Sequence, residues 1–208
     1  MSETSFEERS TAPRETDAPP GTPTRAALVR RRLRGWVSVI LVAAVLALLL
    51  RVFVVQTFYV PSGSMIPTLQ IGDRMLVDKL FFVRDSIQRG DIVVFRRVPA
   101  DNDPGLPADL VKRVIGLPGE TISSRGDTIY INGHRLAEPW LPKLTGLCTD
   151  PNFDITTQKI PANHYFMMGD CRGNSSDSRY WGTVPASYII GKVFVVIWRS
   201  NHPWLHWF

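Results

Sequence analysis

Cysteine is scarce in this chain of 208 residues, which has only Cys148 and Cys171. Neither cysteine belongs to a CxxC pair or lies in a cluster with histidine, and this absence argues against a structural zinc site. If this part of the chain lies in an oxidising compartment, the two can form a disulfide. Because the sequence does not give the distance between them, a disulfide and two separate thiols both stay open.

Patterns typical of nucleic-acid binding are also missing. The chain has no helix-turn-helix or zinc-knuckle pattern, and aromatic residues do not alternate with basic ones. Much of the positive charge gathers instead before the longest apolar run, in Arg25, Arg30, Arg31, Arg32 and Arg34. A cluster of this kind indicates a membrane surface, so we expect no nucleic-acid partner.

Only one hydrophobic run is long, and it covers residues 36–55 with the sequence WVSVILVAAVLALLLRVFVV. At about 1.5 Å per residue, such a helix crosses a hydrocarbon core of roughly 30 Å. Arg51 lies near the exit end, where its side chain can reach the headgroups. A cleaved signal peptide is the alternative, but no small-x-small site follows before Pro61. We therefore predict a transmembrane anchor over residues 36–56.

The segments on the two sides of this anchor differ in composition. Residues 1–35 are rich in Ser, Thr, Pro, Glu and Arg, which predicts a disordered tail. The arginines place the tail in the cytoplasm by the positive-inside rule and send residues 57–208 outside. We therefore expect a single-pass protein of the cell membrane with an extracytoplasmic domain.

Extended helical periodicity is absent after the anchor. Short β-branched and aromatic runs recur between turn signals and predict strands at Met75–Val77, Asp91–Phe95, Leu110–Ile115, Thr128–Ile131, Tyr165–Met168 and Lys192–Trp198. Asn132 and Gly133 predict a type I′ hairpin after the fourth of these strands. The predicted fold class is mostly β, an antiparallel domain preceded by one transmembrane helix.

A serine-rich turn follows the anchor and reads PSGSMIPTL over residues 61–69. Two serines around a glycine, between prolines, indicate a rigid turn that presents a hydroxyl beside backbone N–H groups. Ser64 is the candidate nucleophile of this turn. The turn alone favours an ordinary structural role, because serine, glycine and proline also gather in common loops.

A serine nucleophile needs a base, and the usual arrangements are missing. Gly-x-Ser-x-Gly is absent, and Ser-x-x-Lys fails because Pro67 stands three residues after Ser64. No neighbouring motif indicates a triad for any of the four histidines, which are His134, His164, His202 and His206.

Lys112 is the stronger candidate for the base. It lies inside the apolar strand predicted over residues 110–115, where alternation places it on the face of Leu110 and Val114. Burial lowers the pKa of a lysine. The reduction is required here, since an ordinary lysine is neutral in only roughly one molecule in 2,500 at pH 7. The alternative is an edge-strand lysine that points into solvent.

A third polar cluster covers residues 168–182 and reads MGDCRGNSSDSRYWG. Asp177 and Arg179 are placed to hold this loop by an ion pair, and a serine is available to contact a lysine amine. A solvated loop is one alternative. A calcium site using Asp170, Asn174 and Asp177 is another, although it lacks the spacing of an EF-hand.

Together these segments resemble the bacterial type I signal peptidases, membrane-bound Ser/Lys proteases that remove signal peptides from exported preproteins. Four stretches carry the resemblance in family order: PSGSMIPTL with GD (61–73), RGDIVVF (89–95), KRVIGLPGE (112–120) and the cluster over 168–182. The resemblance covers nearly the whole chain from the anchor onward. Four ordered matches are far more specific than any one of them.

The resemblance implies a serine endopeptidase that cleaves after small residues. Ser64 would be the nucleophile and Lys112 the general base. The Ser64 amide and the Ser62 hydroxyl would form the oxyanion hole. The resemblance implies no metal and no organic cofactor, because the lysine performs both proton transfers.

The same resemblance assigns supporting roles in the third cluster. Ser175 would orient the Lys112 amine, and Asp177 with Arg179 would hold the loop. Two positions depart from the commonest family pattern, since Cys171 stands where asparagine is usual and Gly173 where aspartate is usual.

Secretory preproteins and the lipid bilayer are the partners that this function implies. Aromatic and apolar residues at 58–59 and 80–82, together with Trp204, Trp207 and Phe208, are candidates for bilayer contact, with ordinary packing as the alternative. The sequence does not indicate an oligomeric state.

Two other functions stay open at this stage. A self-cleaving repressor uses the same Ser/Lys chemistry, but it would carry a DNA-binding domain where this chain has a tail and an anchor. A non-catalytic, membrane-tethered β module would leave Lys112 with an ordinary pKa and Ser64 without acylation.

Overall fold

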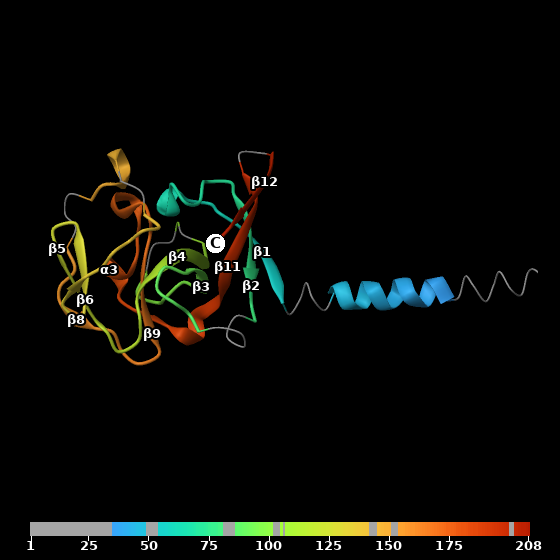
Figure 1. The fold of residues 1–208 in the computed structure, drawn as a ribbon, viewed down its shortest axis with the longest axis horizontal. Helices are drawn as coiled ribbons and strands as arrows, with labels where there is room; N and C mark the ends of the chain where they lie inside the picture. Colours follow the sequence, from blue (N-terminus) through green and yellow to red (C-terminus); the bar gives the residue numbers. More distant parts are fainter. Residues whose placement is uncertain are drawn as a thin grey trace, which may run out of the picture. The chain divides into compact units, whose positions relative to one another are not determined.

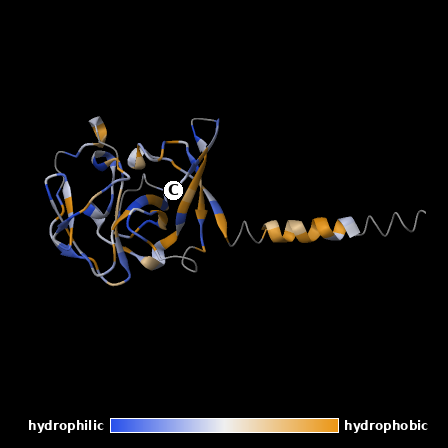
Figure 2. Ribbon diagram, viewed as in Figure 1, coloured by the Kyte–Doolittle hydropathy of each residue, from blue (hydrophilic) through white to orange (hydrophobic). Residues whose placement is uncertain are grey.

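The computed structural model describes residues 35–48, 54–80, 86–101, 105, 107–141, 145–150, 154–199 and 202–208. The chain divides into two compact units, Met1–Leu46 and Ala47–Phe208. Residues 35–48 are helical, and Figure 2 shows that most of this helix is hydrophobic. Among the described residues, no helix combines the length and the apolar character needed to cross a membrane.

The predicted end of the anchor is wrong at its last two residues. Val55 and Gln56 belong to strand β1 (Val55–Tyr59), which pairs with β2 (Arg74–Asp78) in antiparallel register. Val54 and Val55 prolong the apolar pattern of the run, but pairing with β2 decides the backbone conformation. Residues 49–53 of the predicted anchor and residues 1–34 of the predicted tail lie outside the described residues.

Two antiparallel sheets make up the second unit (Figure 1). To β1 and β2, the larger sheet adds β3 (Ile92–Arg96), β4 (Asp109–Gly116), β9 (His164–Met168), β10 (Val184–Pro185), β11 (Ile189–Arg199) and β12 (His202–Trp207). Its order is β1-β2-β11-β3-β4-β9-β10, with β12 paired to β11. The smaller sheet contains β5 (Thr121–Arg125), β6 (Thr128–Ile131), β7 (His134–Arg135) and β8 (Gln158–Lys159), in the order β7-β6-β5-β8.

Short helical turns connect these strands. They are η1 (Gly63–Met65), η2 (Gly146–Cys148), η3 (Arg172–Asn174), α3 (Ser178–Trp181) and η4 (Ala186–Tyr188). Among the described residues from 54 onward, α3 is the only α-helix and has a single turn. The mostly β, antiparallel prediction for this unit is therefore confirmed.

All six predicted strands are present, as β2, β3, β4, β6, β9 and β11. The predicted hairpin joins β6 to β7, and Asn132 and Gly133 both have the positive φ that a type I′ turn requires. Four further strands were not predicted: the serine-rich β5, the two-residue strands β8 and β10, and the histidine-containing β12.

Strands β3 and β4 lie inside the larger sheet and are buried on both faces. Val93 and Phe95 of β3 pack in one hydrophobic cluster, whereas Ile92 and Val94 pack in another. Successive side chains of a strand point to opposite faces, so an uninterrupted apolar run fits this position. A polar side chain on β4 is therefore placed in a largely apolar interior.

Candidate active site

The serine-rich turn is fixed to the core by apolar side chains. Met65 of η1 and Leu69 are both fully buried in the cluster that also contains Val77 of β2. At the end of the turn, Asp73 forms an ion pair with Arg199 of β11 at 2.7 Å. These contacts hold Ser64 in a defined position between β1 and β2.

Lys112 reaches this turn from β4. Its Nζ donates a hydrogen bond to Oγ of Ser64 at 2.7 Å, across 48 positions of sequence. Lys112 is opposite Val93 of β3, and it is 4% exposed, while Ser64 is 7% exposed. The alternative of a solvent-facing edge lysine is wrong, because β4 has β3 on one side and β9 on the other.

The burial of Lys112 changes its protonation. Desolvation lowers the pKa of Lys112 from 10.5 to about 8, against an opposing effect of the Asp177 carboxylate. With this pKa, roughly one molecule in ten carries the neutral amine at pH 7. Lys112 is therefore able to accept a proton from a hydroxyl at 2.7 Å.

Ser62 lies next to the same hydroxyl. Its Oγ is 3.5 Å from Oγ of Ser64, and both side chains line an open pocket of about 480 Å³. The backbone amide of Ser64 is at the start of η1, where the first N–H groups of a helical turn have no partner inside the turn. A hydroxyl and an amide donor thus flank the space beside Ser64.

Ser175 and Asp177 come to the site from the loop between η3 and α3. Ser175 lines the same pocket, but its hydroxyl donates to Asp177 at 2.8 Å, and the described residues contain no hydrogen bond between Ser175 and Lys112. Asp177 is fully buried and also accepts from the amide of Gly169 at 3.1 Å. A Cβ at Gly169 would collide with Ser175 and with the Ser64 carbonyl, so these segments require a glycine here.

Arg179 ties this loop together. It forms an ion pair with Asp177 at 2.8 Å and a second with Asp150 at 2.6 Å. One of its Nη atoms also donates to the carbonyl of Arg172 at 2.7 Å. The pairing of Asp177 with Arg179 agrees with the contact expected from the sequence.

A buried ion pair beside the site was missed in the sequence. Arg113 follows Lys112 on β4 and binds both carboxylate oxygens of Asp170, at 2.8 and 2.6 Å. Thr68 donates to the same carboxylate at 2.5 Å. The Asp170 carboxylate therefore accepts hydrogen bonds from both Arg113 and Thr68. Among the described residues, no cluster of side chains is suited to a metal ion. In the sequence, Arg113 stands out as a charge within an apolar strand, whereas Asp170 lies in the polar cluster of residues 168–182, so nothing marked the two as partners.

The two cysteines are joined by a disulfide. It connects Cys148 of η2 to Cys171, whose amide donates to the Ser64 carbonyl at 3.0 Å. Gly173 lies under the same segment, and a Cβ there would collide with the carbonyl oxygens of Leu147 and Thr149. Both departures from the usual family pattern therefore lie at this contact.

A second, smaller cavity of about 30 Å³ lies beside Ser64 and Lys112. Its apolar lining comes from β1, β2, β3 and β4 and includes Phe58, Met75, Val94, Leu110 and Val111. A cavity needs about 10 to 15 Å³ open to a water-sized sphere to hold one water molecule. This cavity fits only a small side chain.

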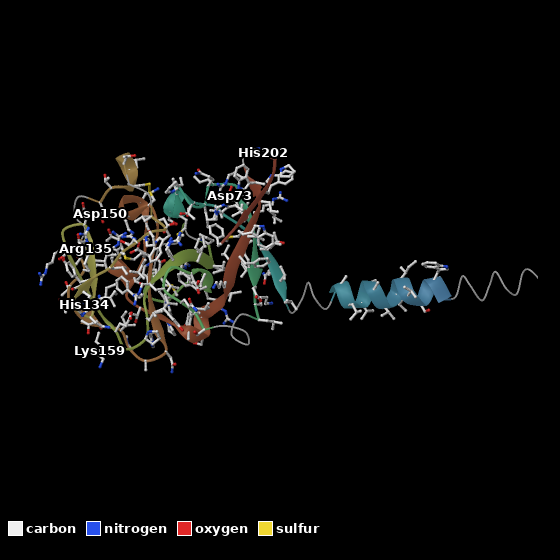
Figure 3. All side chains as sticks on the ribbon, in the orientation of Figure 1. Asp73, His134, Arg135, Asp150, Lys159 and His202 are labelled. Carbon is white, nitrogen blue, oxygen red and sulfur yellow. A yellow bond between two sulfur atoms is a disulfide. The ribbon has the colours of Figure 1, made fainter. Side chains whose placement is uncertain are left out.

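Histidine does not contribute to this arrangement. His134 is exposed on β7, at the outer edge of the smaller sheet (Figure 3). His164 lies near the carbonyl of Ala162, and His202 and His206 are exposed on β12. Within the described residues, the side chains bonded to the Ser64 hydroxyl are Lys112 and Ser62.

Comparisons with known proteins agree on one family. The model of the family "Signal peptidase, peptidase S26" matches residues 33–198. A signal peptidase I of Leptolyngbya laminosa is 40% identical over 161 residues, which cover 76% of each chain. The signal peptidase I T of Bacillus subtilis (strain 168) is 39% identical over 171 residues, covering 80% of this chain and 86% of the relative.

A solved structure of a signal peptidase I is also similar to this chain. The crystal structure of a signal peptidase I from Enterococcus faecalis V583 is 34% identical, covers 52% of this chain and 97% of its own, and has a TM-score of 0.42. The family model and the sequence relatives cover most of the chain and agree with one another. The chain belongs to the signal peptidase family, peptidase S26, and is a serine endopeptidase.

Proposed function

We propose that this protein is a membrane-bound signal peptidase I that removes N-terminal signal peptides from exported preproteins, with Ser64 as nucleophile and Lys112 as general base. The observation that carries the proposal is the 2.7 Å contact between Ser64 and a buried lysine whose pKa is lowered to about 8. A non-catalytic module has no need for a desolvated amine at a serine hydroxyl.

The chemistry needs two proton transfers in each half-reaction. Neutral Lys112 accepts the Ser64 proton as Oγ attacks the scissile carbonyl, and the lysine then donates that proton to the leaving amine. The resulting acyl-enzyme is an ester of Ser64. Lys112 next takes a proton from water, which attacks the ester, and returns the proton to Oγ as the acid product leaves.

Neighbouring groups supply the remaining functions. The Ser64 amide and the Ser62 hydroxyl are placed to donate to the oxyanion that develops on the carbonyl. Asp177 and Arg179 hold the loop that carries Ser175. We assign Ser175 to orienting the Lys112 amine once the substrate is bound, since Ser175 lines the same pocket as Lys112.

The small cavity supports cleavage after small residues. A small cavity of about 30 Å³ beside the Ser64 hydroxyl suits a small side chain better than leucine or phenylalanine. A preprotein with alanine before the cleavage site should therefore be processed far faster than the same preprotein with leucine there.

The predicted anchor supports a location of the protein in the cell membrane. The apolar run over residues 36–55 and the arginines before it support a span with a cytoplasmic N-terminus and an extracytoplasmic catalytic domain. Exposed aromatic side chains at Tyr59, Trp204 and Trp207 are suited to the interfacial region of a bilayer. A signal peptide in the bilayer would present its cleavage site at this surface.

Processing of a test preprotein in detergent checks the proposal directly. Intact protein should release the mature chain, and sequencing of its new N-terminus should place the cut after a small residue. Ser64→Ala and Lys112→Ala should each abolish cleavage while thermal unfolding stays cooperative. Undiminished cleavage by either variant would show that the nucleophile or the base has been assigned wrongly.

A further inference from the structure

An exposed segment lies on the loop that forms one wall of the substrate pocket. This segment, residues 145–150, contains η2, which has no buried residue, and Leu147 is 86% exposed. In Figure 1, it is the gold helical turn that projects at the upper left. Its low burial means that apolar packing contributes little to holding it in place.

Two ties connect this segment to the pocket wall. The covalent tie is the disulfide from Cys148 to Cys171, the residue directly before η3. The second is the ion pair from Asp150, labelled in Figure 3, to Arg179 at 2.6 Å. The two ties end at Cys171 and at Arg179 of α3, on either side of the stretch that contains Gly173 and Ser175.

The contact between segment and wall is close. A Cβ at Gly173 would collide with the carbonyl oxygens of Leu147 and Thr149, so the backbones of the two segments touch at this point. Gly173, Asn174 and Ser175 all line the 480 Å³ pocket next to Ser64 and Lys112. The segment therefore lies behind the pocket wall.

The same tie reaches the nucleophile through the backbone. The amide of Cys171 donates to the carbonyl of Ser64 at 3.0 Å, and the amide of Asn174 donates to the carbonyl of Cys171 at 2.9 Å. The Ser64 side chain, by contrast, is positioned by η1, which is anchored through the fully buried Met65. Loosening Cys171 would thus disturb the pocket wall more than the Ser64–Lys112 pair.

We propose that the Cys148–Cys171 disulfide is a positioning element of the active site, which presses residues 145–150 against Gly173 and so fixes the pocket wall that receives the substrate. This inference rests on the proposed function of the same pocket. The disulfide then serves to position the substrate. Position 173 requires a glycine, because the segment occupies the space that a side chain would need.

Reduction offers a direct test on the full-length protein. Dithiothreitol supplies two electrons and two protons, the disulfide becomes two thiols, and the reagent closes to its own cyclic disulfide. We expect the KM for the test preprotein to rise by roughly tenfold, with a much smaller change in kcat, because misplacement of a binding wall weakens substrate positioning. The pH midpoint of kcat/KM should stay in place, since Lys112 keeps its burial.

The double variant Cys148→Ser, Cys171→Ser is the matched control. It should show the raised KM without reductant and should not respond to dithiothreitol. An unchanged KM after reduction, or global unfolding of the reduced protein at assay temperature, would overturn the positioning role. If the oxidised intact protein cleaves no preprotein at all, the proposed function fails and this inference fails with it.

A coupling experiment tests the contact at Gly173 separately. Gly173→Ala should lower kcat/KM strongly in the disulfide-bonded protein, because the added Cβ meets carbonyl oxygens that are held in place. In the double serine background, the segment is free to move away, so the same substitution should cost much less. Equal losses in the two backgrounds would contradict the proposal even if cleavage itself is normal.

Discussion

The burial of Lys112 lowers the stability of the folded protein at neutral pH. Its pKa is lowered from 10.5 to about 8 by burial, and it is 4% exposed. One pKa unit corresponds to about 1.4 kcal/mol, so the buried ammonium destabilises the fold by about 3 kcal/mol at pH 7, where both states are protonated. Between pH 8 and 10.5, the unfolded state binds more protons, so stability rises with pH until the penalty is gone.

Lys112→Met should therefore stabilise the protein at neutral pH. We expect its free energy of unfolding to exceed that of the unsubstituted protein by up to about 3 kcal/mol at pH 7, measured by urea denaturation, with the difference shrinking toward pH 10.5. Lys159→Met on the exposed edge of β8 serves as the control and should change stability by less than about 0.5 kcal/mol. A destabilised Lys112→Met protein at pH 7 would show that the lysine is paired rather than desolvated.

At the scale of elements, a buried ion pair joins β4 to the loop after β9. Arg113 and Asp170 have side chains that are 5% and 0% exposed. Removing one member leaves the other charge buried without its partner, which typically costs about 3 to 5 kcal/mol. Asp170→Ala should lower the free energy of unfolding by that amount in a denaturant titration.

The ion pair between Lys192 and Asp91 provides the comparison. It joins β11 to the start of β3, and its lysine side chain is 29% exposed. Lys192→Met should change stability by less than about 1 kcal/mol, because this pair keeps part of its hydration and is less buried than Arg113–Asp170. Similar losses for Asp170→Ala and Lys192→Met would mean that burial does not set the strength of these pairs.

Some strands could be predicted from the sequence and others could not. Strand β3 was predictable because a continuous apolar, β-branched run is typical of a strand buried on both faces. Strand β11 was predictable from its β-branched and aromatic residues, although only alternate side chains in its first half are fully buried. Strand β1 was partly assigned to the anchor, because an apolar pattern does not record where pairing with β2 begins. The two-residue strands β8 and β10 are too short to produce a pattern.

The site was predictable to a similar extent. Ser64 and Lys112 were identified from their motifs, and the structure brings them within hydrogen-bonding distance. The disulfide could not be decided, because it depends on a tertiary distance. The hydrogen bond of Ser175 to Asp177 was not predicted either, since hydroxyl partners depend on rotamers that a sequence does not encode.

For the whole molecule, the proposed anchor has a measurable consequence. Full-length protein in membrane vesicles should resist extraction by alkaline carbonate and should require detergent, because its apolar run would lie in the hydrocarbon core. A variant that begins at Val54 keeps β1 and should be extracted without detergent or with far weaker retention. Release of the full-length protein by carbonate would contradict the proposed span.

The most direct test of the Ser64–Lys112 assignment is the pH dependence of kcat/KM for preprotein cleavage by the intact protein, because this profile reports the pKa of the free enzyme's base. Since cleavage requires the neutral amine, we predict a rate that rises with pH and reaches half of its plateau near pH 8, the lowered pKa of Lys112. A midpoint near 6.5 would indicate a histidine base, and one near 10.4 would indicate a solvated lysine; either result would contradict a desolvated Lys112 as the base of Ser64.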